Sequence, residues 1–433
     1  MEPGRAGRCH SDMMANTPGA PSISRRTLLT LLAGTGAATL VGCDPSGAPV
    51  GATSLPDALL VEVADGTGIL RGADRQFIPR SAVTHDGLAI YATAPAGDDT
   101  AFWRIDTISG KTSPPIQLPG RWVPQAVSAD GSRVALTPAA VDVTGGLPSG
   151  RDSTPVLIAD LLGVQAELRL RGNFVPETFT EDLSGLFVLE WLPATAPDHY
   201  RVRLVDIATK APGPLLTRDK VPVPPGAEEE MRGEGRQAVL APDRSTLFTL
   251  YTHQPGHQHT RDLVSGRPGN AHAFVHTLSL VARWAYCIDL PHPFGEGAPS
   301  GHAMAITPDG SKLFVADAAS GSLAEIYTEN QTVGRTTTLG KATGTGAAAT
   351  DGSRLLLGAG TSVRVIDLTR WAVTTEWPVS EQIAGLVLSP DGKRVYIGQT
   401  GAVSWHDPAT GAEQGRIAVP GLTTLTGLAG HRA

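Results

Sequence analysis

One short pattern recurs along the chain and constrains its fold more than any other feature. In its fullest form it is a turn, Ser389-Pro-Asp-Gly392, followed at once by an apolar run at 393–397. Proline fixes φ at the first turn position, aspartate bonds nearby backbone, and glycine accepts a positive φ. Such a turn before an apolar segment predicts a β-hairpin.

Seven such turns can be aligned, at intervals of roughly 40 to 66 residues, which is the range expected of propeller blades. In several units a later apolar strand ends in aspartate. Four short antiparallel strands per unit, repeated and stacked radially, predict an all-β fold, a β-propeller. The turns lie at 84–87, 128–131, 181–185, 241–244, 307–310, 350–352 and 389–392, and the strand-end aspartates are Asp106, Asp160, Asp206, Asp367 and Asp407.

The units at 301–317 and 385–411 resemble those of the seven-bladed propellers often called YVTN or YncE-like, which are loosely related to WD40-like propellers. The resemblance covers roughly residues 57–433 and implies seven blades. The segments 59–63, 68–71 and 422–428 lie outside the seven units. We expect them to close the ring by completing one blade from both ends of the chain. If they build a blade of their own, the ring has eight.

Residues 1–42 resemble a signal peptide rather than part of the fold. Arg25 and Arg26 precede a mostly apolar stretch at 27–41, as in twin-arginine export signals. Leu40-Val-Gly-Cys43 resembles a bacterial lipobox, which implies cleavage before Cys43 and a diacylglycerol on its thiol. The small, polar residues 43–56 then form a flexible linker to the propeller domain, 57–433. The resemblance implies a lipid-anchored protein on the extracytoplasmic face of the cell membrane.

The charge balance and the cysteine content argue against several classes of function. The chain has 35 Lys and Arg against 42 Asp and Glu, and no basic cluster, which argues against nucleic-acid binding. After lipidation of Cys43, Cys287 is the only thiol of the mature chain, so no intramolecular disulfide can form. Its place between Tyr286 and Ile288 indicates a buried, small apolar side chain rather than a nucleophile.

Histidines gather in residues 251–302. If 271–280 is a strand, His272 and His276 share one face, and His257 and His259 lie on an exposed loop. Imidazoles grouped in this way can bind Zn²⁺ or Cu²⁺, although their spacing matches no established metal motif. The alternative is that they are hydrogen-bonding surface or inter-blade residues. The candidate metal ligands are His253, His257, His259, His272 and His276.

An acidic run at 227–236 is open to two interpretations. It is either a loop that binds a cation or a partner on a propeller face, or a solvated loop. No Gly-x-Ser-x-Gly elbow and no phosphate-binding glycine loop occur, and the repeated aspartates are turn residues, so no catalytic set is indicated.

Two functional hypotheses follow. The first is a non-enzymatic binding or scaffold module that is held at the membrane by its lipid and binds a protein or a cell-wall polymer. The second is an extracytoplasmic metal-binding protein or metalloenzyme that uses the histidines of 253–302.

Overall fold

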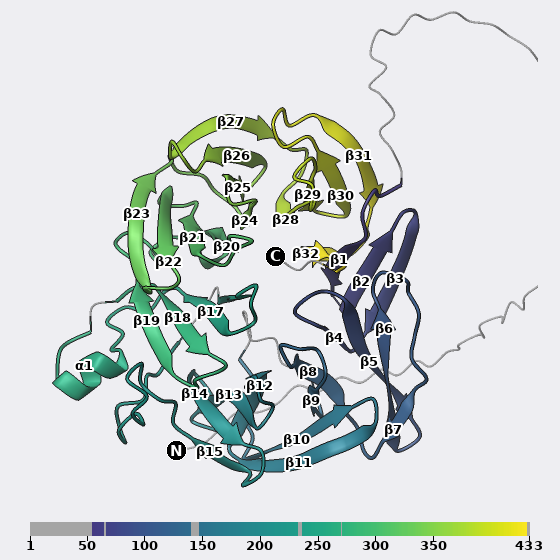
Figure 1. Cartoon of the computed structure of the whole chain (residues 1–433), viewed down its shortest axis with the longest axis vertical. Helices are drawn as coiled ribbons and strands as arrows, with labels where there is room; N and C mark the ends of the chain where they lie inside the picture. Colours follow the sequence, from purple (N-terminus) through teal and green to yellow (C-terminus); the bar gives the residue numbers. More distant parts are fainter. Residues whose placement is uncertain (1–53, 65, 140–146, 233–235, 270, 431–433) are drawn as a thin grey trace, which may run out of the picture. The chain divides into compact units, whose positions relative to one another are not determined.

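The computed structural model describes residues 54–64, 66–139, 147–232, 236–269 and 271–430. These residues form eight four-stranded antiparallel sheets, arranged as the blades of a ring (Figure 1). Strands β24, β28 and β32 lie near the centre of the ring, and β23, β27 and β31 lie at its periphery. The predicted all-β propeller is confirmed.

Blade 1 joins the two ends of the described chain. It holds β1 (Leu59–Val63), β2 (Gly66–Arg71), β3 (Asp74–Pro79) and β32 (Leu422–Leu428). β32 pairs antiparallel with β1, with Leu428 opposite Leu59. The end segments therefore form a blade of their own. The ring has eight blades, the stated alternative, and the count of seven is corrected because the turn-marked units omit this blade.

The next three blades follow in chain order. Blade 2 holds β4 (Ser81–Val83), β5 (Ala89–Ala96), β6 (Asp99–Asp106) and β7 (Ile116–Leu118). Blade 3 holds β8 (Val123–Val127), β9 (Val134–Thr137), β10 (Ser153–Asp160) and β11 (Gly163–Arg171). Blade 4 holds β12 (Asn173–Phe179), β13 (Gly185–Leu192), β14 (His199–Asp206) and β15 (Ala211–Gly213).

The second half of the ring is built in the same way. Blade 5 holds β16 (Gln237–Leu240), β17 (Thr246–Tyr251), β18 (Phe274–Ser279) and β19 (Ala285–Asp289). Blade 6 holds β20 (His302–Ile306), β21 (Lys312–Asp317), β22 (Ser322–Tyr327) and β23 (Thr332–Thr338). Blade 7 holds β24 (Gly346–Thr350), β25 (Arg354–Ala359), β26 (Ser362–Asp367) and β27 (Ala372–Pro378). Blade 8 holds β28 (Ile383–Leu388), β29 (Val395–Gln399), β30 (Ala402–His406) and β31 (Glu413–Ala418).

The repeated turn joins the first two strands of a blade. In blade 6, Thr307 Oγ1 and the Ser311 amide both donate to Asp309 Oδ1, at 2.5 and 3.0 Å, and Gly310 has a φ of 73°. Blade 5 lacks that glycine, and Arg244 takes the left-handed conformation instead, with a φ of 64°. The hairpin therefore survives where the sequence pattern erodes.

The core is distributed around the ring rather than gathered at one point. Among the described residues, eight hydrophobic clusters each combine side chains of successive blades. One of them packs Tyr396 and Trp405 of blade 8 against Leu59 and Leu425 of blade 1. No blade buries both faces alone, so each blade is stabilised by its neighbours.

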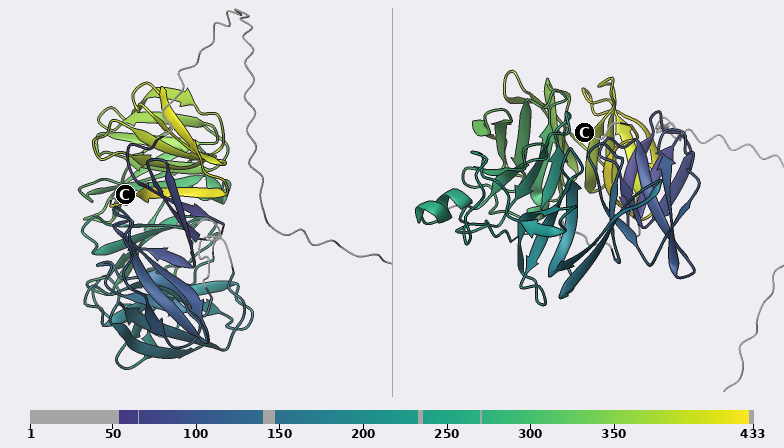
Figure 2. Two further views of the ribbon diagram at one scale, coloured as in Figure 1. Left: turned by 90° about the vertical axis from the view of Figure 1, so that its right-hand side faces the viewer. Right: turned by 60° about the horizontal axis from the view of Figure 1, so that its bottom comes forward.

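Helical structure is sparse. The part of the chain that the structure describes has one α-helix, α1 (Thr260–Ser265), which stands away from the ring beside blade 5 (Figures 1 and 2), and one 3₁₀ turn, η1 (Pro299–Gly301), which precedes blade 6. Within the described ranges, no helix has the length and apolar character needed to cross a bilayer. The proposed signal residues Arg25 and Arg26 and the lipidation site Cys43 lie outside the described residues.

Candidate metal centre

Two long connections meet at the outer side of blade 5. One joins β15 to β16, and the other joins β17 to β18 and carries α1. The amide of Thr260 donates to Glu229 Oε1 at 2.8 Å, and its hydroxyl donates to the Ala227 carbonyl at 3.0 Å. The acidic run and the histidine-rich segment are separate stretches of the sequence, and these hydrogen bonds show that they pack against each other.

Three polar side chains converge on the carboxylate of Glu229. Cys287 Sγ lies 3.0 Å, His259 Nδ1 3.4 Å and His257 Nε2 3.6 Å from Glu229 Oε2. The ligand atoms of Glu229, His259 and Cys287 all lie within 4.8 Å of one another. Zinc holds nitrogen, oxygen and thiolate ligands about 2.0–2.3 Å away in a tetrahedron, so ligands around one ion lie under 4 Å apart. The donor set fits such an ion with small side-chain movements.

His257 is a second buried histidine beside Glu229. The residue is only 7% exposed, and its Nε2 atom has no hydrogen-bond partner. Its ring stacks on Phe274, with 4.5 Å between the ring centroids, and is thereby fixed in orientation. Its charge partner is the Glu229 carboxylate, 3.6 Å from Nε2, so His257 adds a second buried imidazole to the surroundings of Glu229.

Asp289 orients His259 from the opposite side. His259 Nε2 lies 2.5 Å from Asp289 Oδ1, and Arg261 Nη2 donates to Asp289 Oδ2 at 2.6 Å. Metal-binding histidines commonly bond a carboxylate through their second nitrogen, which fixes the ring and its tautomer. The bond to Asp289 leaves Nδ1 of His259 directed at Glu229.

The electrostatics of the cluster determine which protons a bound cation would have to displace. Burial opposes ionisation of Glu229, yet the imidazoles of His257 and His259 hold its pKa well below the usual range. Burial lowers the pKa of His259, but Asp289 and Glu229 outweigh it and raise the pKa to about 8. Burial, followed by the charge of Glu229, raises the pKa of the Cys287 thiol. Without metal the cluster therefore holds protons that an incoming cation would displace.

A cavity of about 300 Å³ adjoins the cluster. Glu229 and Cys287 form part of its wall, and the apolar part of the wall includes Val202, Leu215 and Tyr286. The cavity therefore gives a metal at the cluster an open side.

Comparison with known proteins finds distant structural resemblances. No family model and no curated protein matches this chain. Among solved structures, the chain resembles the dihydro-heme d1 dehydrogenase NirN in complex with DHE, with a TM-score of 0.48 and 14% identity over 89% of this chain and 78% of that one. It also resembles apo AztD from Citrobacter koseri, with 0.47 and 11% over 85% and 96%. For BamB from Moraxella catarrhalis the values are 0.40 and 10%, over 80% and 92%.

The structure divides the predicted histidine ligands among three places. His257 and His259 lie together at the cluster, and both are buried, which corrects the expected exposed loop. His276 lies opposite Cys287 in the pairing of β18 with β19. His272 precedes β18, so the expected strand at 271–280 is shorter and the shared face with His276 is corrected. The ring centroid of His272 lies 4.6 Å from that of His292. That of His253 lies 6.3 Å from that of His302.

His276 differs from His259 in its ionisation. It lines the cavity, and burial lowers its pKa to about 4. The imidazole is therefore neutral at physiological pH and adds no positive charge to the site.

Three residues of the cluster were not identified as ligands from the sequence: Glu229, Cys287 and Asp289. Each lies in a segment that the sequence marks as unusual, namely the acidic run and the strand that ends at residue 289. A signal for Asp289 exists, since it ends a strand as the turn aspartates do but is followed by Leu290-Pro291 rather than by a turn. Only the packing of the two connections shows that these segments meet.

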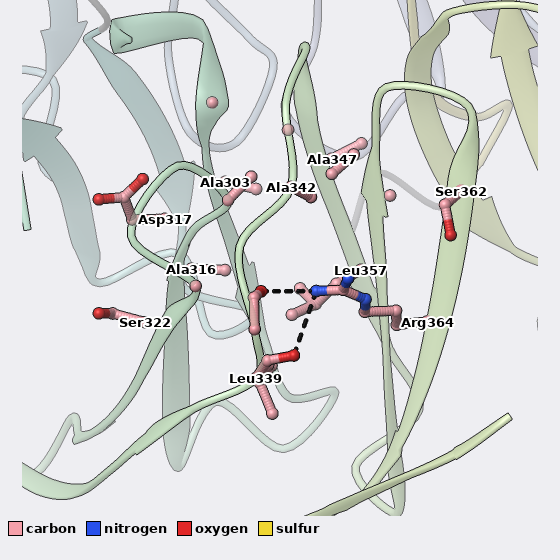
Figure 3. Close-up of a pocket in the computed structure, with 17 residues that line it drawn as sticks. Ala303, Ala316, Asp317, Ser322, Leu339, Ala342, Ala347, Leu357, Ser362 and Arg364 are labelled. Atoms are coloured by element: carbon pink, nitrogen blue, oxygen red, sulfur yellow. Dashed lines mark hydrogen bonds between the residues drawn. The ribbon is translucent and has the colours of Figure 1, made fainter. Parts of the chain in front are cut away.

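A second hollow, between blades 6 and 7, has a different character. Its wall is mostly glycine and alanine, and Arg364 Nη1 donates to the carbonyls of Leu339 and Gly340 at 3.3 and 2.8 Å (Figure 3). Its volume of about 30 Å³ suits a single water molecule. Its one guanidinium is already occupied, so this hollow is not a candidate ligand site.

Proposed function

We propose that this protein binds a divalent transition metal, Zn²⁺ or Cu²⁺, through Glu229, His259 and Cys287. The observation that carries the proposal is the convergence of His259 and Cys287 on the carboxylate of Glu229. A mixed set of nitrogen, oxygen and thiolate ligands is typical of zinc, and thiolate also suits copper.

The role proposed for the metal centre is binding rather than catalysis. A ring of blades holds the two connections on a rigid support, which is how propellers and other scaffolds carry binding loops. The donor set accounts for capture of the ion without any further reactive group.

The test is the metal content of the full chain, expressed through its own export route and purified without a histidine tag. We expect about one equivalent of zinc or copper per chain, lost in Glu229→Gln and in Cys287→Ser. The matched control is His272→Ala with His292→Ala, because this pair lies outside the cluster and should keep the metal. A wild-type protein that takes up no metal, or a Cys287→Ser protein that keeps it, would contradict the proposal.

We further propose that the protein is exported and anchored to the outer face of the cell membrane through Cys43. The paired arginines Arg25 and Arg26 and the Leu40-Val-Gly-Cys43 sequence support this. At that location the propeller would bind a protein or a cell-wall polymer through its exposed loops, as a scaffold for the metal-binding blade.

Fractionation of cells tests the anchor. Cys43→Ala should move the protein from the membrane fraction to the soluble fraction, whereas Cys9→Ala, a cysteine within the signal segment, should not. Retention of the Cys43→Ala protein in the membrane fraction would show that the anchor lies elsewhere.

A further inference from the structure

We infer that the cavity beside the metal cluster binds a second ligand, a small carboxylate with an apolar body, together with the metal. This inference rests on the proposed metal site and names what occupies the open side of that site. It follows from the position, the lining and the charge of the cavity.

The position of the cavity gives it access to the metal. Two of the three ligand residues, Glu229 and Cys287, also line the cavity. A centre with three protein ligands leaves a coordination position open to water or to an added ligand. The volume of about 300 Å³ lies at the small end of the range for small-molecule sites. A compact molecule therefore fits with one group on the metal.

The lining fits an apolar body. Val202, Leu215 and Met231 form part of the wall, and the ring of Tyr286 forms another part. Small-molecule sites typically combine apolar walls with polar groups that fix the orientation of the ligand. Other lining residues are polar or charged, and among them Glu229 and Cys287 belong to the metal cluster. A ligand with one polar group at the cluster and an apolar body against Val202, Leu215 and Met231 would use both kinds of lining.

The charges favour a carboxylate as the polar group at the cluster. Glu229 and the Cys287 thiolate together balance the two positive charges of the ion. Glu228, which also lines the cavity, is neutralised by Arg201 Nη1 at 2.9 Å and Arg203 Nε at 3.1 Å. The site thus carries no net negative charge that would exclude an anion once the metal is present.

The positive charge of Arg218 attracts the added carboxylate. Its guanidinium lies over the Tyr286 ring, 5.3 Å from the centroid, and makes no ion pair with any described residue. Arg261 lies over the same ring at 5.5 Å but already bonds Asp289. The adjacent Asp219 also lines the cavity and opposes an anion, so removing its charge should strengthen binding.

The test uses the full chain loaded with Co²⁺, whose visible absorption reports changes in the metal's ligands, and benzoate as the added carboxylate. Benzoate should change the absorption in a saturable way. Benzamide, which has nearly the same shape without the charge, should not. Metal-free protein should not bind benzoate, as measured by calorimetry. Benzoate that binds equally well without the metal would overturn the inference.

Three variants locate the site. Arg218→Ala should weaken benzoate binding about two- to fivefold, as expected for an exposed charge, and Asp219→Asn should strengthen it. Arg335→Ala is the matched control, because Arg335 also lies over an aromatic ring, that of Trp371, on another blade. Val223→Trp should fill the cavity and abolish benzoate binding while the cobalt content stays near one equivalent.

The outcomes separate the two proposals. A wild-type protein that takes up no cobalt, zinc or copper refutes the metal site and this inference with it. A protein that holds cobalt but shows no response to benzoate, or responds equally in the Val223→Trp variant, refutes only the second ligand.

Discussion

Blades 5 and 8 both bury histidines, but they treat the imidazole nitrogens differently. In blade 8, His406 Nε2 lies 2.8 Å from Ser404 Oγ and His406 Nδ1 lies 3.0 Å from the Gly411 carbonyl, so both are partnered. In blade 5, His257 Nε2 has no hydrogen bond to a described residue and lies 3.6 Å from the Glu229 carboxylate. A buried histidine with both nitrogens hydrogen-bonded is held by the fold, whereas His257 lies against a carboxylate of the candidate metal centre.

The connections explain why the two blades diverge. In blade 8, β29 ends at Gln399 and β30 begins at Ala402, which leaves room for a tight turn only. In blade 5, β17 ends at Tyr251 and β18 begins at Phe274, and the residues between them carry α1. A longer connection costs little additional entropy, so one blade can gain a site while the ring keeps its packing.

Removing a ligand in blade 5 should have the largest effect. Glu229→Gln and Cys287→Ser should lower zinc affinity by more than about 100-fold, beyond the 10- to 100-fold loss typical of residues that only orient a ligand. Competition with a fluorescent chelator measures this affinity. His406→Ala should leave it unchanged, and an equal loss in that variant would erase the distinction between the two blades.

Replacing Asp289, the carboxylate that orients His259, should have the second-largest effect. Asp289→Ala should weaken zinc binding about 10- to 100-fold, because His259 loses the partner that fixes its ring. Asp407→Ala is the control, since Asp407 also follows a blade strand but bonds only turn amides. The same competition assay applies, and unchanged affinity in the Asp289→Ala protein would show that His259 is held by other contacts.

The histidine of blade 8 should matter for stability instead. His406→Ala removes one of the two partners of the buried Ser404 hydroxyl, the other being Gln399, and should lower the free energy of unfolding by about 1–3 kcal/mol. Denaturant unfolding, monitored by circular dichroism, measures this change. A loss no larger than that of an exposed substitution would show that the hydrogen-bond network of blade 8 is dispensable.

The smallest effect concerns the repeated turn. The Thr307 hydroxyl, followed by the Ser311 amide, lowers the pKa of Asp309 to about 2 from its usual 3.8. Because the folded pKa lies below the unfolded one, the contribution of this carboxylate is complete above pH 4 and is lost as the pH falls towards 2. Asp309→Asn should therefore cost about 0.5 kcal/mol at pH 7, the low end for an exposed hydrogen bond.

A pH series of thermal unfolding checks the sign of that effect. The difference between Asp309→Asn and the wild type should shrink as the pH falls from 4 to 2. In blade 5 the position of Thr307 is held by Ala241, which has no hydroxyl, so Asp243→Asn should cost less than Asp309→Asn at pH 7. A larger cost in blade 5 would show that the hydroxyl is not what strengthens the turn.

The fold was more predictable than the candidate site, for a physical reason. Pro-Asp-Gly turns act locally, so the hairpins at residues 307–310 and 389–392 can be recognised within a few residues. The cluster depends on the meeting of Glu229, His259 and Cys287, which come from two connections and a peripheral strand. Hydrophobic patterning fixes which strands form but not how long connections pack, so the acidic run and the histidines could be recognised as unusual but not as partners.

The pairing of Leu59 with Leu428 has a consequence for how the ring assembles. Contacts between residues so far apart in sequence form slowly, because closing a very long loop must precede the gain from pairing. Until β32 docks, β1 presents an unpaired edge, and exposed edges invite pairing with other chains. β32 therefore closes the ring by covering the free edge of β1. Deletion of residues 422–428 should lead to aggregation rather than to a smaller stable ring.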